Sequence, residues 1–344
     1  MEQHKLVEGN LLDEKGNLCE KGYSFCPCKK YNRNDIKVNK FRIKEWDYYY
    51  VGNKERGLAL TVADNGYMAL ASVTVFDFRK PAKYVEKSIM SAFPLGKLGL
   101  PSTSEDGDVE WKKGKISFSF IKNKDKRRLI VSFPSFGEKK EDFHCDLTLT
   151  ETTPHSMVIA TPFDKKGHFY YNQKINNQKV LGYAKVGDEL IDFSNNTYGV
   201  LDWGRGVWTY KNTWYWSSLN WEDENGLPIG FNLGYGFGDT SAASENVFFY
   251  GKDVYKLGII KMDIPLDSKG RDDFLSPWHF RGEEGSVDLI FTPVLRRKGG
   301  GNALIIISKQ NQIFGTFSGK VIIEGKEFLI KDYPGFAEKV FNCW

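Results

Sequence analysis

The chain has 344 residues, with 48 basic against 44 acidic side chains and a formal net charge of +4. Nucleic-acid binding needs basic side chains gathered on one face, and the chain has no long basic block, so no nucleic-acid partner is expected. No apolar run approaches the roughly 20 residues of a transmembrane helix, so no integral membrane segment is expected either. The length suggests roughly two domains.

The N-terminal residues and the cysteines indicate the compartment. The first ten residues, MEQHKLVEGN, lack the apolar core of a signal peptide. Five cysteines stand at positions 19, 26, 28, 145 and 343, and Cys26 and Cys28 are too close together and too isolated for a paired zinc site. We therefore expect a cytoplasmic protein with free thiols and no bound metal. The oligomeric state is left open.

Short alternating segments and turn signals predict β structure over most of the chain. Residues 58–62 and 67–78 flank residues 63–66 (ADNG), and Asn-Gly is the strongest short hairpin signal because it accepts positive φ. Residues 116–121 (ISFSFI) and 144–150 (HCDLTLT) alternate polar with apolar side chains. Strands that recur every roughly 8–12 residues with turns between them are typical of sandwiches and barrels.

One segment departs from this pattern. Residues 83–93 (KYVEKSIMSAF) place Tyr84, Ile89 and Phe93 near helical spacing, which predicts a short amphipathic helix. Convincing helical stretches are otherwise few.

The two halves of the chain repeat one arrangement. An aromatic run at residues 46–50 (WDYYY), and another at 214–221, are each followed by a hydrophilic turn and a second strand. Polar and Gly-containing residues accumulate near 162–172. We therefore predict an all-β fold of two antiparallel barrel or sandwich halves packed together, with domains at residues 1–165 and 166–344.

The stretch from residue 199 to residue 250 holds five of the nine tryptophans, with glycines among them. In extended strands, one face would carry Trp214, Trp216, Ser218 and Asn220, and a face of the next strand would carry Asn232 and Gly234. If these faces meet, the glycines leave room above the indoles, and the rings line a hollow. The alternative is that the indoles fill a core. Three polar side chains without partners in a dry core would be costly, which favours the hollow.

Ligand-binding residues are predicted from this stretch and from the aromatic run of the first half. They are Trp46, Tyr48, Trp203, Arg205, Trp208, Trp214, Trp216, Asn220, Asn232 and Glu245. The rings would supply contact area, and the planar guanidinium of Arg205 would bind an anionic group. We expect the ligand to be a small, mainly apolar molecule with a polar or anionic end, such as a lipid or isoprenoid.

Two carboxylates are candidates for acid–base catalysis. Asp202 lies among indoles, where desolvation would raise its pKa, and Glu45 shares a strand face with Asp47. Either would protonate a double bond, and the indole faces would stabilise the resulting cation. The alternatives are an Asp202–Arg205 ion pair, an Asp202 that forms a turn, and a pair of exposed strand carboxylates at Glu45 and Asp47.

Three functions remain open on this basis. The first, which we favour, is a ligand-binding β-barrel protein. The second is a cofactor-independent enzyme that hydrates, isomerises or cyclises an alkene-containing lipid, and the third is a structural or interaction protein with a filled core. The chain has no Gly-x-Ser-x-Gly elbow, Walker loop or Rossmann fingerprint, so no cofactor is expected.

Several motifs resemble a family known as domain of unknown function 2804. They are Tyr31-Asn32-Arg33, residues 44–49 (KEWDYY), 63–67 (ADNGY), 201–208 (LDWGRGVW) and 230–234 (GFNLG), and Glu245-Asn246, which extend over most of the chain. More distantly, the two-part layout and residues 335–338 (GFAE) are similar to the tandem lipocalin-like barrels of hydroxyneurosporene synthase and tocopherol-cyclase-type proteins. That resemblance implies two lipocalin-like halves, and fold does not fix chemistry.

Overall fold

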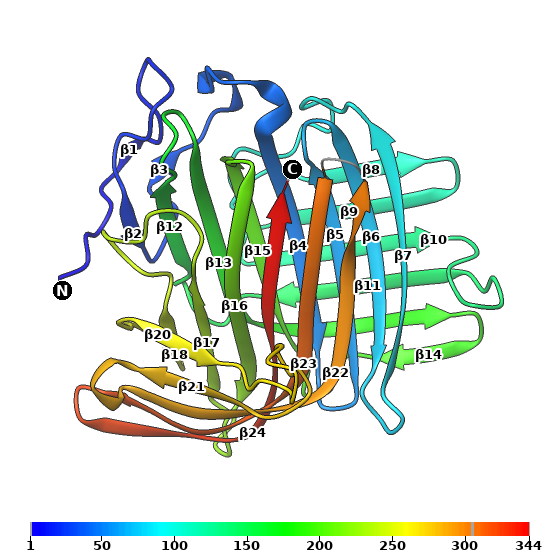
Figure 1. Ribbon diagram of the computed structural model, residues 1–344. Helices are drawn as coiled ribbons and strands as arrows, with labels where there is room; N and C mark the ends of the chain where they lie inside the picture. The colour runs from blue at the N-terminus through cyan, green and yellow to red at the C-terminus, as the bar shows by residue number, and fades with distance from the viewer. Residues whose placement is uncertain (1, 304–305, 344) are drawn as a thin grey trace.

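The computed structural model describes residues 2–303 and 306–343, most of which lie in strands or in the turns between them (Figure 1). Within these residues the strands form a 13-stranded, a nine-stranded and a two-stranded sheet. The predicted all-β fold of two antiparallel halves is confirmed. No helix in this part of the chain is long and apolar enough to cross a membrane.

The strands divide between the sheets as follows. The first sheet contains β2 (Gly22–Ser24), β4 (Ile43–Gly52), β5 (Arg56–Asp64), β6 (Met68–Asp77), β7 (Lys83–Ala92), β8 (Val109–Lys113), β9 (Ile116–Asn123), β10 (Lys126–Phe133), β11 (Phe143–Thr150), β12 (Met157–Pro162), β13 (Phe169–Val186), β14 (Glu189–Asp192) and β15 (Tyr198–Val207). The second contains β16 (Lys211–Glu222), β17 (Pro228–Tyr235), β18 (Val247–Tyr250), β19 (Asp253–Lys256), β20 (Ile260–Asp263), β21 (Trp278–Gly282), β22 (Val287–Ala303), β23 (Ile306–Ile323) and β24 (Lys326–Cys343). Strands β1 (Gly9–Asn10) and β3 (Lys29–Lys30) pair with each other, and three short 3₁₀ turns are η1 (Arg33–Asp35), η2 (Lys40–Arg42) and η3 (Glu283–Gly285).

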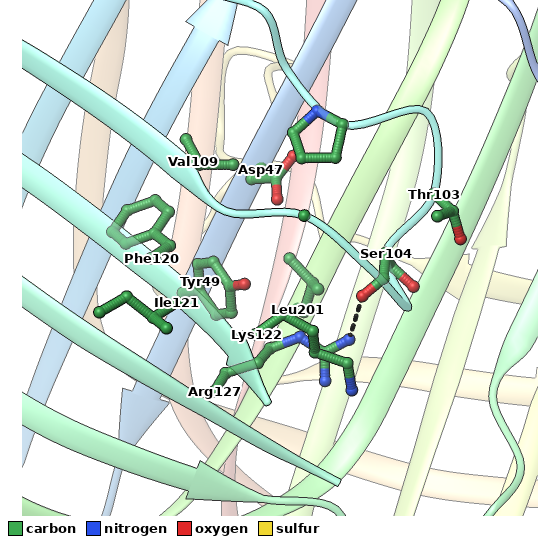
Figure 2. A pocket seen from close by; sticks show the side chains of 12 residues that line it. Asp47, Tyr49, Thr103, Ser104, Val109, Phe120, Ile121, Lys122, Arg127 and Leu201 are labelled. Carbon is green, nitrogen blue, oxygen red and sulfur yellow. Dashed lines mark hydrogen bonds between the residues drawn. The ribbon is translucent and has the colours of Figure 1, made fainter. Parts of the chain in front are cut away.

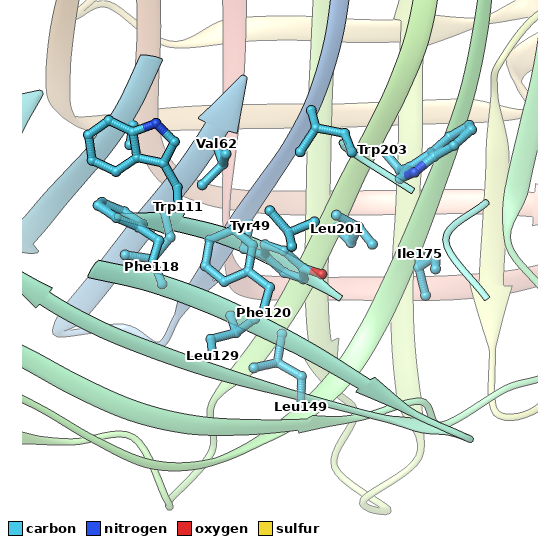
Figure 3. Packing of buried hydrophobic residues seen from close by; sticks show 14 of the residues in the cluster. Tyr49, Val62, Trp111, Phe118, Phe120, Leu129, Leu149, Ile175, Leu201 and Trp203 are labelled. Carbon is cyan, nitrogen blue, oxygen red and sulfur yellow. The ribbon is translucent and has the colours of Figure 1, made fainter. Parts of the chain in front are cut away.

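The first sheet curls around its own core. Its main path runs β7-β6-β5-β4-β15-β13-β11-β10-β9-β8, and strands β8 to β11 cross behind β4 to β7 (Figure 1). Side chains from both arms meet inside, including Tyr49 of β4, Val62 of β5, Phe120 of β9 and Leu129 of β10 (Figure 3). Burial of this apolar surface closes the sheet into a half barrel.

The second sheet curls in the same way, in the order β19-β18-β17-β16-β24-β23-β22-β21-β20. Its core is rich in phenylalanine, with 4.5 Å between the ring centroids of Phe291 and Phe317. Strands β22 to β24 are 17 or 18 residues long and carry irregularities between Pro293 and Leu295 and next to Phe317. Such bulges bend a strand, so each long strand serves both this core and the contact with the first sheet.

The two sheets pack face to face through a third aromatic cluster. It contains Tyr50, Phe76, Trp216, Phe314 and Phe336, and the ring centroids of Phe76 and Phe314 are 4.3 Å apart. Strands β4 and β15 are therefore covered on both faces, and every residue of β15 is buried. Burial on both faces explains why apolar and aromatic side chains do not alternate regularly with polar ones along these two strands.

The predicted hairpin at residues 63–66 is confirmed. Strand β5 ends at Asp64, β6 begins at Met68, and Gly66 between them has a φ of +79°. The alternating segments 116–121 and 144–150 lie in β9 and β11.

The helix predicted for residues 83–93 is wrong. Strand β7 occupies this segment and pairs with β6 along its whole length. Val85 and Ile89 pack on the core of the first half, whereas Tyr84 and Met90 face the second sheet. Apolar side chains on both faces break the two-residue alternation and imitate helical spacing.

The chain passes from the first sheet to the second at residues 208–210, between Val207 of β15 and Lys211 of β16. The 18-residue strand β13 begins at Phe169 and pairs with β11, β12, β14 and β15 of the first sheet. The predicted domain division between residues 165 and 166 therefore precedes three strands of the first sheet, β13, β14 and β15.

Candidate functional site

A cavity of about 670 Å³ lies between the two sheets. Strands β4 to β7, β13 and β15 of the first sheet and β16, β22, β23 and β24 of the second supply its wall, with Phe237 and Glu245 from the segment after β17. Small-molecule sites typically measure roughly 300–1,000 Å³. The contact between the halves thus contains a space of ligand size, which we call the interface cavity.

Part of the wall of the interface cavity is aromatic. Trp46, Trp208, Trp214 and Phe237 pack edge to face, with ring centroids 5.3 Å apart for Trp46 and Trp208 and 4.8 Å apart for Trp208 and Phe237. Gly204 of β15 makes room for this packing, because a Cβ at that position would lie 2.0 Å from Cζ2 of Trp46. A glycine in the middle of a buried strand therefore serves to admit an indole from the neighbouring strand.

Charged side chains lie beside these rings. Lys174 of β13 is buried, and its Nζ lies 2.8 Å from Oδ1 of Asp202 and 3.8 Å from the ring centroid of Trp216. The side-chain amide of Asn172 donates a hydrogen bond of 2.6 Å to the same Oδ1. The ammonium is thus held between a carboxylate and an indole face, which fixes Lys174 and Asp202 in the wall.

Glu338 of β24 lies in the wall of the interface cavity beside Trp214 and Gln312. It accepts hydrogen bonds from Nε1 of Trp214 at 2.8 Å and from Nε2 of Gln312 at 3.3 Å. Burial raises the pKa of Glu338 from 4.5 to about 7, because the charged form loses its water. A carboxyl group with this pKa can both donate and accept a proton near neutral pH.

Tyr170 joins these groups into one cluster. Burial raises the pKa of its hydroxyl, and the negative charges of Asp202, Glu245 and Glu338 raise that pKa further. Burial also raises the pKa of Glu245, whose Oε2 accepts a hydrogen bond of 3.2 Å from the amide of Asn232. Three carboxylates therefore lie near one phenol in the wall of the interface cavity.

Seven predicted site residues line the interface cavity. They are Trp46, Tyr48, Asp202, Trp208, Trp214, Trp216 and Glu245. The Trp214 face does meet the Asn232 face, because Trp216 pairs with Gly234 and Ser218 with Asn232. Asn232 itself lies behind the wall, where its Oδ1 accepts a hydrogen bond of 2.7 Å from Nε1 of Trp216.

Trp203 and Arg205 point away from the interface cavity, because alternate residues of a strand face opposite sides. Arg205 Nη2 donates hydrogen bonds to Oδ1 of Asp47 at 3.1 Å and to the carbonyl of Pro101 at 2.8 Å. Figure 2 shows Asp47 at a hollow of only about 10 Å³ in the first half, about the space of one water. The suggested Asp202–Arg205 ion pair is not formed, since Asp202 pairs with Lys174 instead.

Glu45 and Asn220 also lie outside the wall. Glu45 accepts a hydrogen bond of 2.7 Å from the hydroxyl of Tyr31 and forms an ion pair with Arg33, on the side of β4 that faces the first half. The Oδ1 of Asn220 accepts a hydrogen bond of 2.9 Å from the amide of Asn176 in β13. Glu45 therefore ties N-terminal residues to β4, and Asn220 ties the second sheet to the first.

A second hollow, of about 620 Å³, lies on the other side of β13 and β15. Trp203 and Tyr171 line it, each next in sequence to a residue of the interface cavity. Residues of the N-terminal segment, including Cys28 and Tyr31, complete its wall. Alternate residues of the same two strands thus line two separate spaces.

Sequence reasoning missed several residues of the interface cavity. They include Tyr170, Lys174, Arg297, Gln312 and Glu338. The run 172–178 (NQKINNQ) was a usable signal, because so many buried amides in one strand need partners on both faces. Glu338 gave no comparable signal, since its place depends on the pairing of β24 with β16, which sets it opposite Trp216.

The fold and the site define an all-β protein of two lipocalin-like half barrels with a ligand-sized cavity between them. Among the described residues, no group of three or more His, Cys, Asp or Glu side chains is arranged to hold a metal ion. The chain belongs to the family described as Domain of unknown function (DUF2804), which it matches over residues 2–344. No curated protein matches it in sequence.

Solved structures share the fold. An AttH-like protein from Nitrosomonas europaea gives a TM-score of 0.51 at 13% identity, covering 91% of this chain and 97% of that chain. CghA with Sch210972 gives a TM-score of 0.50 at 8% identity, covering 98% and 97%. Kievitone hydratase from Nectria haematococca gives a TM-score of 0.47 at 12% identity, covering 93% and 98%. At these identities the likeness to the AttH-like protein and to CghA is one of fold alone.

Proposed function

We propose that this protein binds a mainly apolar small molecule, of the lipid or isoprenoid kind, in the interface cavity. The observation that carries the proposal is a hollow of about 670 Å³ with aromatic rings and one cluster of charged groups in its wall. Contact with the rings supplies most of the affinity, because removal of apolar surface from water is favourable in any orientation. The charged cluster binds the polar end of the ligand and thereby fixes the orientation of the ligand in the interface cavity.

The likeness to CghA supports this proposal as an analogy. CghA was solved with Sch210972 and shares the fold with this chain at a TM-score of 0.50. A protein of this architecture therefore accommodates a small molecule. The chemistry of that molecule does not carry over, because fold does not determine function.

Extraction and native mass spectrometry of the purified protein test the proposal. We expect a copurified apolar molecule, or one-to-one binding from an isoprenoid and fatty-acid panel with a change in tryptophan fluorescence. Trp214→Phe removes the indole that donates to Glu338 and should weaken binding about tenfold. Trp221→Phe is the matched control, because Trp221 lies on the same strand outside the interface cavity. No recovered molecule and no fluorescence change with any ligand would refute the proposal.

A second candidate function is cofactor-independent acid–base catalysis on an alkene, which the pKa of Glu338, near 7, favours. The carboxyl proton of Glu338 adds to one alkene carbon, and the faces of Trp208 and Trp214 stabilise the positive charge on the other. If water adds to the cationic carbon and then releases a proton to Asp202, the product is a hydrated alkene. If instead a carbon next to the cationic carbon releases a proton to Asp202, the product is an isomerised alkene. Proton return to Glu338 completes the cycle. Glu338 replaces Asp202 as the acid because Asp202 is paired with Lys174.

Two variants separate an enzyme from a carrier. Glu338→Gln and Asp202→Asn keep the shape of the wall and remove one proton donor or acceptor each. If the protein is an enzyme, both variants should still bind the alkene. Its mass or double-bond position should change with time in the wild-type protein but not in the variants. A carrier would leave the bound molecule unchanged in the wild-type protein as well, as observed by mass spectrometry and nuclear magnetic resonance of the extracted ligand.

A further inference from the structure

The charges in the wall of the interface cavity are unequal in number. Among the described residues, four carboxylates line it, Glu86, Asp202, Glu245 and Glu338, and two cationic side chains, Lys174 and Arg297. If all six were ionised, the wall would carry two excess negative charges. A low-dielectric enclosure strengthens the effect of such an imbalance on any charged ligand.

Each of the two cationic side chains already forms an ion pair with one of the carboxylates. Lys174 Nζ lies 2.8 Å from Asp202 Oδ1, and Arg297 Nε lies 2.6 Å from Glu86 Oε2. The second pair joins β22 to β7 across the interface cavity. An anionic ligand would have to displace one of these partners, which leaves a buried carboxylate unpaired.

Within the part of the chain that the structure describes, no cationic side chain lies in contact with Glu245 or Glu338. Glu338 accepts from the indole of Trp214 and the amide of Gln312, and Glu245 accepts from the amide of Asn232, all of them neutral donors. Burial raises the pKa of both carboxyl groups, which means that each charge costs free energy in this site. A cation brought close to them would offset that cost.

Two further features suit a cation. The rings of Trp208, Trp214 and Phe237 surround the same space, and the faces of aromatic rings attract positive charge. Tyr170 is only 6% exposed, lines the interface cavity, and makes no hydrogen bond through its hydroxyl to any described residue. Its oxygen is therefore available to a donor group on a ligand, in the midst of three carboxylates.

We propose that the ligand of the interface cavity has a positively charged end, an ammonium group on an apolar body, which sits against Glu245 and Glu338 beneath the aromatic rings. This inference rests on the proposed function and specifies its ligand. The anionic end expected from the sequence depended on Arg205, which faces the other side of β15. The same carboxylates and rings would also stabilise a carbocation.

Binding of a cation is then coupled to the release of a proton from Glu338. The charged and titratable groups that face Glu338 are Lys174 and Tyr170 of β13, Asp202 of β15, Arg297 of β22, Tyr48 of β4 and Glu245. A carboxylate binds the ligand cation and a neutral carboxyl does not, so affinity should rise with pH up to about 7. Release of one proton gives at most about a tenfold change in affinity per pH unit.

Three ligands with the same apolar tail test the inference on the intact protein: dodecyltrimethylammonium, dodecanol and dodecanoate, each below its micelle concentration. The quaternary ammonium has no proton to lose, so any pH dependence of its binding comes from the protein. Titration calorimetry and tryptophan fluorescence at about pH 5.5 and about pH 8 supply the affinities. We expect the ammonium to bind at least about tenfold more tightly than the other two at about pH 8, and this preference to shrink at about pH 5.5.

Glu338→Gln should abolish the preference for the ammonium and its pH dependence while dodecanol still binds. Glu224→Gln is the control, because Glu224 is an exposed carboxylate far from the interface cavity. Tighter binding of dodecanoate than of the ammonium at about pH 8 would overturn the inference and leave the proposed function intact, and this comparison needs no variant. If none of the three ligands binds, the proposed function fails and the inference fails with it.

Discussion

Single residues of this protein differ in function according to which face of a strand they occupy. Asp202 and Arg205 are three positions apart in β15, so they point to opposite sides of the sheet, one into the interface cavity and one into the first half. The residues opposite them decide what each does. Lys174 pairs with Asp202, and Asp47 with Arg205.

Glu338→Gln should change the pH dependence of stability. The pKa of Glu338 is about 7 in the folded protein against an ordinary value of 4.5. Because the folded pKa is raised, the contribution of the protonated carboxyl is fully present below about pH 4.5 and is lost as the pH rises through about 7. The wild-type protein should therefore lose up to about 3 kcal/mol relative to the glutamine variant between about pH 4.5 and about pH 8.

Urea unfolding of both proteins across this pH range measures the difference. Parallel pH profiles for wild type and Glu338→Gln would contradict the raised pKa. Glu224→Gln should run parallel to wild type, since Glu224 is exposed.

Arg205→Lys should destabilise the fold while the affinity of the interface cavity changes little. The guanidinium of Arg205 is fully buried and reaches Asp47 and the carbonyls of Trp46 and Pro101, a set that one ammonium cannot satisfy. Breaking such a buried network costs about 3–5 kcal/mol. Urea unfolding checks the loss of stability. A variant with wild-type stability but weakened ligand binding would instead place Arg205 in the ligand site.

Among the strands, how well the sequence predicts each one depends on which of its faces carry apolar side chains. The hairpin at Asn65-Gly66 was predictable because its signal is local, and β9 and β11 were predictable because each alternates between a buried and a partly buried face. Strand β7 was taken for a helix because it carries apolar side chains on both faces. The aromatic part of the site was predictable from the density of rings, whereas Glu338 was not, because strand pairing alone brings it there.

Gly204→Ala should destabilise the protein by about 1–3 kcal/mol and weaken ligand binding. A Cβ at this position would lie 2.0 Å from the indole of Trp46, which must then move into the interface cavity. Urea unfolding and ligand titration measure the two effects. Gly301→Ala is the control for stability alone, because no described heavy atom lies within 4 Å of a Cβ there but Gly301 itself lines the interface cavity. Equal stability of the two variants would show that Trp46 is not held by Gly204.

At the scale of the whole molecule, the interface cavity exists because two curled sheets with filled cores meet over an incompletely filled contact. The aromatic cluster around Tyr50 and Phe314 closes one part of that contact, and the cavity occupies another. Two halves were predictable from the repeated arrangement of aromatic runs and turns. The change of sheet at residues 208–210 was not, because it depends on β15 pairing back onto β4, which lies much earlier in the chain.

A crystal structure with the copurified molecule, or with the tightest ligand of the dodecyl series, would show directly whether the interface cavity binds a ligand. We expect electron density for one apolar molecule between the two half barrels, with its charged end near Glu338 and beneath the rings of Trp208 and Trp214. Density only in the second hollow beside Trp203, with water alone in the interface cavity, would contradict the account.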